Sequence, residues 1–281
     1  MADLISVIVA TYNRADALGA VLRSLTRQTD RDFEVLVADD GSDVATARVV
    51  TEWAARMPIP LKHVWHPDRG FRLAAIRNRA IRVSTGSYCI FLDGDCIARR
   101  DFVAAHRRLA EPGWFVTGNR ILLSRELTER ILVEGLEPEQ WGFANWITQR
   151  ALRNVNRFAP LLDLELHGLR KLHSRRWRGA RGSNMAFWRS DLDKVDGFDS
   201  NFSGWGREDS DIFVRLIRSG VLRKDGRFAT GVLHLWHPET DRSRLAENEK
   251  QLTDLLEGNR VRARQGLSRL IEQTDAAKNV Q

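Results

Sequence analysis

The first half of the chain alternates short runs of apolar, β-type residues with longer stretches of helical periodicity. The predicted strands lie at residues 4–10, 33–38, 61–65, 88–92 and 114–117, and the predicted helices lie at 15–27, 43–56, 72–84 and 101–110. Such alternation predicts a mostly parallel sheet with helices on both faces, because each helix returns the chain to the next parallel strand. Ligands of these sheets bind beyond the carboxyl ends of the strands, so the residues that follow each strand are the first candidates for a site.

Three of these strand-end turns are polar, and two of them are acidic. They are Thr11-Tyr12-Asn13-Arg14, Asp39-Asp40-Gly41-Ser42 and Asp93-Gly94-Asp95. The first turn has no glycine, and the chain contains neither a Gly-x-Gly-x-x-Gly turn nor a P-loop. Carboxylates beside a nucleotide are chemically sensible where a divalent cation joins them to its phosphates. Each acidic turn alone is equally compatible with an ordinary Asp-Gly turn or a helix N-cap.

Two further groups of reactive side chains follow residue 180. The run Phe202-Ser203-Gly204-Trp205-Gly206-Arg207-Glu208-Asp209-Ser210-Asp211 leads into a predicted helix at Glu208–Arg218 with three carboxylates in its first turn. Acids complement the dipole at any helix start, but Trp205 adds an aromatic surface that a helix cap does not need. His234 and His237 follow a β-type run at 228–233 and are candidate metal ligands, or ordinary surface or core histidines.

The positive charge of the chain is concentrated in one segment. The formal net charge is +7, and residues 150–181 contain nine basic and two acidic residues, so this segment alone accounts for the net charge. It suits an anionic partner, whether a phosphorylated acceptor, an anionic membrane surface or nucleic acid, or it is a solvated helical face. Trp177 within the segment fits either a membrane interface or a platform for a sugar.

Length and cysteine content exclude several classes of protein. A chain of 281 residues suits two domains or one large α/β domain. Cys89 and Cys96 are too few for a disulfide framework or a thiolate zinc site. No apolar run reaches the roughly 18 residues of a membrane span, and the first residues lack the basic region of a signal peptide. We therefore expect a soluble, reduced, cytoplasmic protein, peripheral at the inner face of a membrane if the basic segment binds lipid.

The order and spacing of the motifs resemble those of the family 2 glycosyltransferases of the GT-A fold. The resemblance spans about residues 4–240 and rests on residues 7–14, 38–42 and 92–95, with the helix Gly70-Phe71-Arg72-Leu73-Ala74-Ala75-Ile76-Arg77-Asn78 between them. The 202–211 motif is similar to the Trp-Gly-x-Glu-Asp signature of the galactosyltransferase-like C-terminal module in β-1,4-galactosyltransferases and chondroitin-polymerase-type enzymes.

The resemblance implies an α/β, Rossmann-like fold with a mostly parallel central sheet and a C-terminal acceptor-binding half. Residues 1–118 then form the nucleotide-sugar-binding half of a GT-A domain. Residues 119–240 form the acceptor-binding and catalytic half, which includes the basic insert at 150–181, and residues 241–281 form a helical tail.

The resemblance also implies roles for individual residues. Asp209 is the expected general base for the acceptor hydroxyl, and Glu208 is expected to orient the site. Asp95, His237 and His234 are the expected metal ligands, and this donor set suits Mn²⁺, or else Mg²⁺. The expected nucleotide-sugar site comprises Thr11, Tyr12, Arg14, Asp39, Arg77, Asp93 and Gly94. The expected acceptor contacts are Trp205, Gly206 and Asn184.

The implied activity is the inverting, metal-dependent transfer of a sugar from a UDP-sugar to a saccharide hydroxyl, with a β-linkage as product. The acceptor is expected to be a saccharide or glycolipid of polysaccharide or lipopolysaccharide assembly, and a phosphorylated acceptor suits the basic insert; no nucleic-acid partner is expected. One alternative is a sugar nucleotidyltransferase, which ordinarily carries a glycine-rich basic loop after its first strand. A second is a non-catalytic protein that binds membrane or nucleic acid, which leaves Asp93, Asp95 and Asp209 without a role. A transferase-like protein that binds without turnover is a third.

Overall fold

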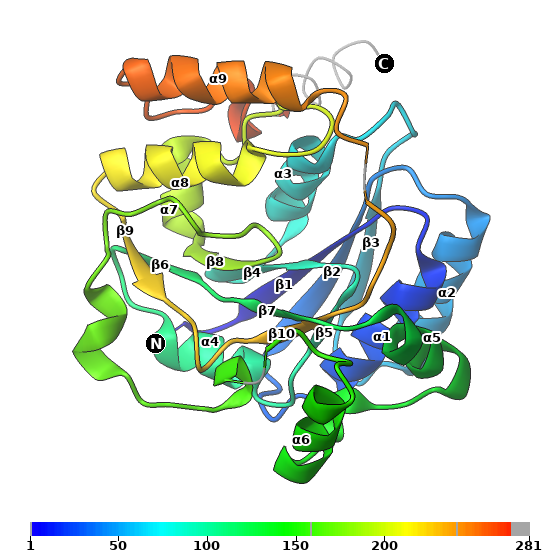
Figure 1. Ribbon diagram of the computed structural model, residues 1–281. Coiled ribbons are helices and arrows are strands. Elements are labelled where there is room, and N and C mark those ends of the chain that lie inside the picture. The colour runs from blue at the N-terminus through cyan, green and yellow to red at the C-terminus, as the bar shows by residue number, and fades with distance from the viewer. Residues whose placement is uncertain (1, 158, 240, 271–281) are drawn as a thin grey trace.

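The computed structural model describes residues 2–157, 159–239 and 241–270, and within them the chain is built around a seven-stranded sheet (Figure 1). The strands lie in the order β3-β2-β1-β4-β8-β6-β9. Their bounds are β1 Ile5–Thr11, β2 Phe33–Asp39, β3 Leu61–Trp65, β4 Tyr88–Asp93, β6 Trp114–Thr117, β8 Asn184–Trp188 and β9 Leu222–Asp225. Strands β1 to β4 are parallel, whereas β8 runs antiparallel to β4 and β6. The predicted mostly parallel α/β sheet is confirmed.

Helices cover both faces of this sheet (Figure 1). Their bounds are α1 Ala15–Thr26, α2 Val44–Arg56, α3 Leu73–Val83, α4 Phe102–Leu109, α5 Arg125–Glu134, α6 Phe143–Ala151, α7 Arg189–Val195, α8 Glu208–Arg218 and α9 Leu245–Glu257, with short 3-10 helices at Pro138–Gln140, Ala159–Leu161 and His167–Lys171. One core cluster joins one face of β1 to α1, α4 and α5, and a second joins the other face to α3, α7 and α8. Helix α9 packs on the outside of α8.

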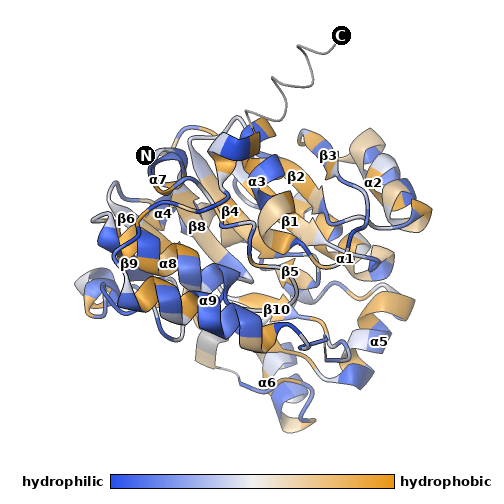
Figure 2. Ribbon diagram, turned by 90° about the horizontal axis from the view of Figure 1, so that it is seen from above, coloured by the Kyte–Doolittle hydropathy of each residue, from blue (hydrophilic) through white to orange (hydrophobic). Residues whose placement is uncertain are grey.

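The sequence of β1 shows why it lies at the centre of the sheet. Every residue of β1 is buried. Val7 and Val9 belong to the core cluster of α1, whereas Ile8 belongs to the cluster of α3. A strand covered on both faces needs apolar residues at successive positions, which accounts for its unbroken hydrophobic run. Figure 2 shows these hydrophobic strands at the centre, with helices of mixed character around them.

A small second sheet positions the residues that follow β4. It contains β5 Cys96–Ala98, β10 Val232–His234 and β7 Arg120–Leu122, in the order β5-β10-β7. The pairing of β5 with β10 is antiparallel and sets Cys96 opposite His234. Residues almost 140 positions apart in the chain are therefore brought to the edge where β4 ends.

The C-terminal part agrees with the predicted helical tail at α9 but not directly after it. Helix α9 ends at Glu257, and residues 258–266 run as an irregular strap. The strap departs from helical geometry because buried carboxylates bind its backbone. Asp199 accepts hydrogen bonds from the N–H groups of Arg264 and Gln265, and Asp196 accepts one from Ser268. The remainder of the predicted tail, residues 271–281, lies outside the described residues.

Two simpler expectations can be compared with the structure directly. Cys89 and Cys96 are both buried and free. Over the described ranges, no helix combines the length and the apolar character that crossing a membrane requires.

Candidate active site

Three side chains that could hold a metal ion converge where β4 and β10 end. Asp95, His234 and His237 place their ligand atoms within 4.8 Å of one another. The Asp95 carboxylate lies 3.7 Å from Nε2 of His234 and 3.4 Å from Nε2 of His237. Burial lowers the pKa of His234, although Asp95 opposes the shift. Its imidazole is therefore neutral at pH 7, which is the form that binds metal ions.

The environment of His237 also suits metal binding. Its Nδ1 lies 2.6 Å from the carbonyl oxygen of Pro238. A carbonyl can only accept, so Nδ1 carries a proton, and Nε2 is the ring nitrogen that lies beside Asp95 and could bind an ion. Two imidazole nitrogens and a carboxylate oxygen form a donor set that fits a first-row divalent ion such as Mn²⁺.

A buried arginine, Arg77 of α3, lies between the Asp93-Gly94-Asp95 turn and the Glu208–Asp209 pair. Its side chain is 1% exposed. Nη2 donates to Oδ1 of Asp93 at 3.0 Å, and Nη1 lies 3.4 Å from Oε1 of Glu208. Burial raises the pKa of Asp93, Arg77 opposes that shift and Asp95 adds to it. We expected Arg77 at the nucleotide, but its guanidinium is occupied by protein carboxylates.

The two acids at the start of α8 have different surroundings. Oδ2 of Asp209 accepts a hydrogen bond from the Gly182 N–H at 2.9 Å, and Oδ1 accepts one from the Ser210 N–H at 2.6 Å. Burial, together with the adjacent Asp209 carboxylate, raises the pKa of Glu208 to about 7, although Arg77 opposes the shift. Asp209 is thus held in place by hydrogen bonds, whereas Glu208 titrates near neutral pH, where general acids and bases are most effective.

The ends of β1 and β2 bring Thr11 and Asp39 together, since the two residues are paired in register. Asp39 is fully buried, and its carboxylate accepts from the Ser42 N–H at 2.8 Å and contacts Nε2 of His63 at 2.9 Å. Burial opposes ionisation, but these hydrogen bonds lower the pKa of Asp39 and keep it charged. Gly94 lies at the same edge, where a Cβ would stand 2.7 Å from a backbone oxygen of β1. Glycine is thus required there for close packing.

Tyr12 and Arg14 diverge after β1. Tyr12 is 44% exposed, and its hydroxyl donates to Asp68 at 2.9 Å, so it reaches the loop that follows β3. Arg14 forms an ion pair with Asp16 at 3.0 Å, at the start of α1. The structure therefore places Tyr12 beside the Thr11–Asp39 edge and turns the charge of Arg14 toward its own helix.

The turn that carries Trp205 is shaped by left-handed backbone. Gly204 and Gly206 have φ of +72° and +102°, values that favour glycine. Trp205 is 37% exposed, and the guanidinium of Arg242 lies 4.9 Å from its ring centroid. A partly exposed indole directly before the Glu208–Asp209 pair is available to a sugar face.

Asn184, which we expected at the acceptor, lies in the core instead. Its side chain is fully buried, with Oδ1 3.1 Å from Nε2 of His106, and its Nδ2 donates to the carbonyl groups of Asn119 and Thr230. A Cβ at Gly118 would approach the same amide to 2.2 Å. The amide of Asn184 joins strands and connecting loops and is not presented to a ligand.

Two residues that were not identified from the sequence also lie beside the candidate site. Arg120 of β7 acts electrostatically on Asp93 and His234, and among the described residues no hydrogen bond or ion pair holds its guanidinium. Trp236, between the two histidines, is 39% exposed and has Arg125 5.2 Å from its ring centroid. The sequence offered one weak signal for each residue: Arg120 is a basic residue just past the predicted strand at 114–117, and Trp236 is an aromatic residue between two histidines.

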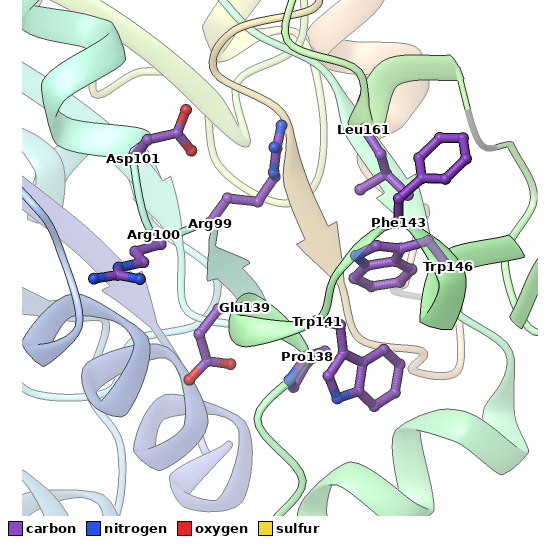
Figure 3. Close-up of a pocket in the computed structure, with 9 residues that line it drawn as sticks. All are labelled: Arg99, Arg100, Asp101, Pro138, Glu139, Trp141, Phe143, Trp146 and Leu161. Atoms are coloured by element: carbon purple, nitrogen blue, oxygen red, sulfur yellow. The ribbon is translucent and has the colours of Figure 1, made fainter.

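A hollow of about 160 Å³ lies apart from this cluster, beside α6 (Figure 3). Trp141, Phe143 and Trp146 line one side of it, with Arg99 and Glu139 across from them. The buried carboxylate of Glu139 points away from Trp146 in Figure 3, and it lies 3.7 Å from a guanidinium nitrogen of α1. None of the predicted site residues lines this hollow.

The basic insert at 150–181 divides into structural and exposed parts. Arg170 is 6% exposed, and its guanidinium donates to the carbonyl oxygens of Leu164, Asp225 and Arg227. Lys171 pairs with Glu111 at 2.7 Å. These two cations anchor the insert. Most of the remaining basic residues are exposed.

Two family models match the chain. The model described as glycosyl transferase family 2 matches residues 6–161, and the model described as N-terminal domain of galactosyltransferase matches residues 167–235. The two matches together cover Asp95 and His234 of the candidate metal site as well as the Glu208–Asp209 pair.

Curated relatives match over most of this chain but only part of their own length. The validoxylamine A glucosyltransferase of Streptomyces hygroscopicus subsp. jinggangensis is 33% identical over 82% of this chain and 55% of its own. The chondroitin synthase of Pasteurella multocida is 30% identical over 78% of this chain and 23% of its own. The chain thus spans about half, or less, of these proteins.

Solved structures match at the level of the fold. The mannosyltransferase PcManGT from Pyrobaculum calidifontis, in complex with GDP-Man and Mn²⁺, aligns with a TM-score of 0.62 at 21% identity and covers 92% of this chain and 65% of its own. TarS of S. aureus (residues 1–349) in complex with UDP aligns with a TM-score of 0.55 at 13% identity and covers 89% of this chain and 64% of its own.

Proposed function

The chain belongs to glycosyl transferase family 2, and from that premise we propose that it transfers a sugar from a nucleotide-sugar donor to a hydroxyl group of a saccharide acceptor. One observation carries the proposal: the carboxylate–histidine cluster and the Glu208–Asp209 pair lie near Asp93, at the edge where the parallel strands end, and Arg77 joins Asp93 to Glu208. The carboxylate–histidine cluster suits the diphosphate of a donor, and the Glu208–Asp209 pair suits the hydroxyl group of an acceptor. Residues 1–118 are then the donor half, 119–240 the acceptor half and 241–281 a tail.

The proposed donor is a UDP-sugar. Thr11, Tyr12 and Asp39 form the base end of the site, at the ends of β1 and β2. TarS has been solved with UDP and PcManGT with GDP-Man, so related folds accept either nucleotide. The ionised Asp39 suits the imide N–H of uracil or the amino edge of guanine, and the test below therefore includes both.

Asp95, His234 and His237 are the proposed ligands of Mn²⁺. Bound there, the ion would supply Lewis-acid neutralisation of charge on the departing diphosphate. Arg120 faces the same place with a guanidinium that no described residue holds, and we assign it to the donor phosphates. Asp93 is assigned to the ribose or the donor sugar.

Asp209 is the proposed general base. The acceptor oxygen attacks the anomeric carbon, the bond from that carbon to the UDP oxygen breaks, and the hydroxyl proton passes to the Asp209 carboxylate. Two hydrogen bonds fix this carboxylate, so position compensates for its weak basicity toward an alcohol. A single displacement of this kind inverts the anomeric configuration, so a UDP-α-sugar gives a β-linked product. Trp205 is assigned to a face of the acceptor sugar.

Calorimetric titration of UDP and of GDP, with and without Mn²⁺, tests the proposal. We expect UDP to bind tightly only when Mn²⁺ is present, and a panel of UDP-sugars then to show slow hydrolysis or transfer to saccharides. If GDP binds and UDP does not, the donor nucleotide carries guanine and not uracil. If UDP binds equally well with and without Mn²⁺, the proposed metal site is contradicted. If neither UDP nor GDP binds, the proposed transfer of a sugar from these nucleotides is contradicted.

The exposed part of the insert is proposed to contact an anionic membrane or its phosphorylated glycolipid. Leu169 and Leu172 are 62% and 69% exposed and lie just before the exposed Arg175 and Arg176. Apolar side chains beside cations suit a negatively charged bilayer surface, where each Lys or Arg contributes about 1 kcal/mol.

Vesicle sedimentation checks this surface. The protein is expected to sediment with phosphatidylglycerol-containing vesicles and not with phosphatidylcholine vesicles, and to detach as salt rises. Leu169→Asp/Leu172→Asp should abolish sedimentation. Val133→Asp is the control, because Val133 is 85% exposed but lies on α5. Equal binding to both lipids, or none, would contradict the assignment.

A further inference from the structure

Arg77 connects the two functional groups of the site through more than one contact. Its Nη2 binds Asp93 at the end of β4, and its Nη1 reaches Glu208 at the start of α8. Nη2 also donates to the carbonyl oxygen of Gly182 at 3.2 Å, in the segment just before β8. One side chain therefore joins three elements that are far apart in the sequence.

The Gly182 peptide extends this connection to the second acid. Its carbonyl accepts from Arg77 and its N–H donates to Asp209 at 2.9 Å. A Cβ on Gly182 would lie 3.0 Å from Cβ of Asp209, so glycine permits the close approach. Arg77 is thus linked to Glu208 directly and to Asp209 through one peptide group.

The next residue of α3 holds the segment that leads to α8. Asn78 is fully buried; its Nδ2 donates to the carbonyl of Phe198 at 2.7 Å, and its Oδ1 accepts the N–H of the same residue at 2.9 Å. The ring of Phe198 in turn lies 5.4 Å from the guanidinium of Arg77. Two adjacent residues of α3 therefore hold this region: Arg77 positions the acids of α8, and Asn78 holds Phe198 in the segment that precedes α8.

Both terminal nitrogens of Arg77 are occupied, and the side chain is almost completely buried. A nucleotide phosphate could bind it only by displacing protein carboxylates. We propose that Arg77 is a positioning residue, which rests on the proposed function: it sets the Glu208–Asp209 pair against the donor-side Asp93 and does not itself hold the nucleotide.

The matched variants are Arg77→Met and Arg79→Met. Arg79 is an exposed arginine two positions along the same helix. We expect Arg77→Met to lower kcat about 100-fold, the effect of a small misplacement of reacting groups. The Kd for UDP and Mn²⁺, and the donor KM, should stay within about threefold of the unchanged protein, because uniform binding is retained. Arg79→Met should behave as the unchanged protein. A comparable loss of UDP affinity in Arg77→Met would overturn the proposal.

The pH profile separates positioning from a purely structural role. The charged groups that face Glu208 are Arg77 from α3, Asp93 from β4 and Asp209 of its own helix. Loss of the Arg77 cation should move the acid limb of the kcat profile to higher pH, and Arg77→Lys should restore part of that shift. An unmoved profile would overturn the proposal.

Two further variants keep the test independent of folding and of the transfer reaction. Gly182→Ala leaves Arg77 in place and should lower kcat without weakening UDP binding. An unchanged kcat would count against the connection from Arg77 to Asp209 through the Gly182 peptide. A double-mutant cycle of Arg77→Met with Glu208→Gln in urea unfolding should show non-additivity, and additivity would overturn the contact. If no nucleotide sugar is turned over but the cycle is non-additive, the proposed function fails while the Arg77 link stands.

Discussion

Replacing Asp209 with asparagine is expected to lower kcat about 10³-fold, the typical contribution of a positioned general base. Asparagine is nearly isosteric and can keep the hydrogen bond from the Gly182 N–H through its amide oxygen, although it gives up the bond from the Ser210 N–H. The contact that ties Asp209 to the segment before β8 should therefore be retained. UDP binding in the presence of Mn²⁺ should be unchanged, because the metal cluster is untouched. Steady-state kinetics beside a calorimetric titration measure both effects.

Glu208→Gln is the comparison that assigns roles within the pair. The pKa of Glu208 is raised to about 7, so this carboxyl is protonated below that pH and ionised above it. If the ionised form is needed, kcat rises with pH through about 7, and the glutamine variant loses this step. A larger loss of kcat in Glu208→Gln than in Asp209→Asn would exchange the two roles.

The same shift has the opposite sign for stability. Because the pKa of Glu208 is raised in the folded state, the folded protein holds this proton more tightly than the unfolded chain between about pH 4.5 and 7. The contribution of Glu208 to the free energy of unfolding therefore falls as pH rises through that window. Urea unfolding of the native and Glu208→Gln proteins at pH 5 and pH 8 should show that the free energy of unfolding falls more between these pH values in the native protein than in the variant.

The parts of the fold that local pattern determines were predictable. The apolar run at residues 4–10 identified a strand of a mostly parallel sheet, and the acids after residues 33–38 and 88–92 were correctly placed at one edge of that sheet. Helix α8 has the predicted bounds, Glu208–Arg218. In each of these cases one short stretch of sequence contains the hydrophobic periodicity, the length of the element and its flanking residues.

Other features depend on contacts between distant segments. The antiparallel strand β8 inserts between β4 and β6, although β6 precedes it by about 70 residues in the chain. That insertion decides that Asn184 faces the core and that Gly182 touches Asp209. Arg77 and Arg79 are equivalent by residue type, and only the packing of α3 shows that one is buried and the other exposed. Tertiary pairing, not local propensity, determines these assignments.

Asp95→Ala is expected to abolish the Mn²⁺ dependence of UDP binding. Asp95 is the sole carboxylate within the cluster, and both histidines face it. Loss of an outer-shell partner of a metal site typically costs 10–100-fold in affinity, so loss of this ligand should reduce Mn²⁺ affinity by more than about 100-fold. Residual UDP binding through the ends of β1 and β2 should then be weak and indifferent to metal.

The control and the companion variants decide between a metal site and a general loss of charge. Asp254→Ala removes an exposed carboxylate on α9 and should leave metal-dependent binding intact. His234→Ala and His237→Ala should each weaken Mn²⁺ binding, and His234, being the more deeply buried, should lose more because water replaces it less readily. Calorimetry with Mn²⁺ and UDP measures the native protein, these four variants and Asp93→Ala. If Asp95→Ala keeps metal-dependent UDP binding while Asp93→Ala loses it, the metal lies at the other carboxylate of the turn, and the role of Arg77 as partner of Asp93 would have to change with it.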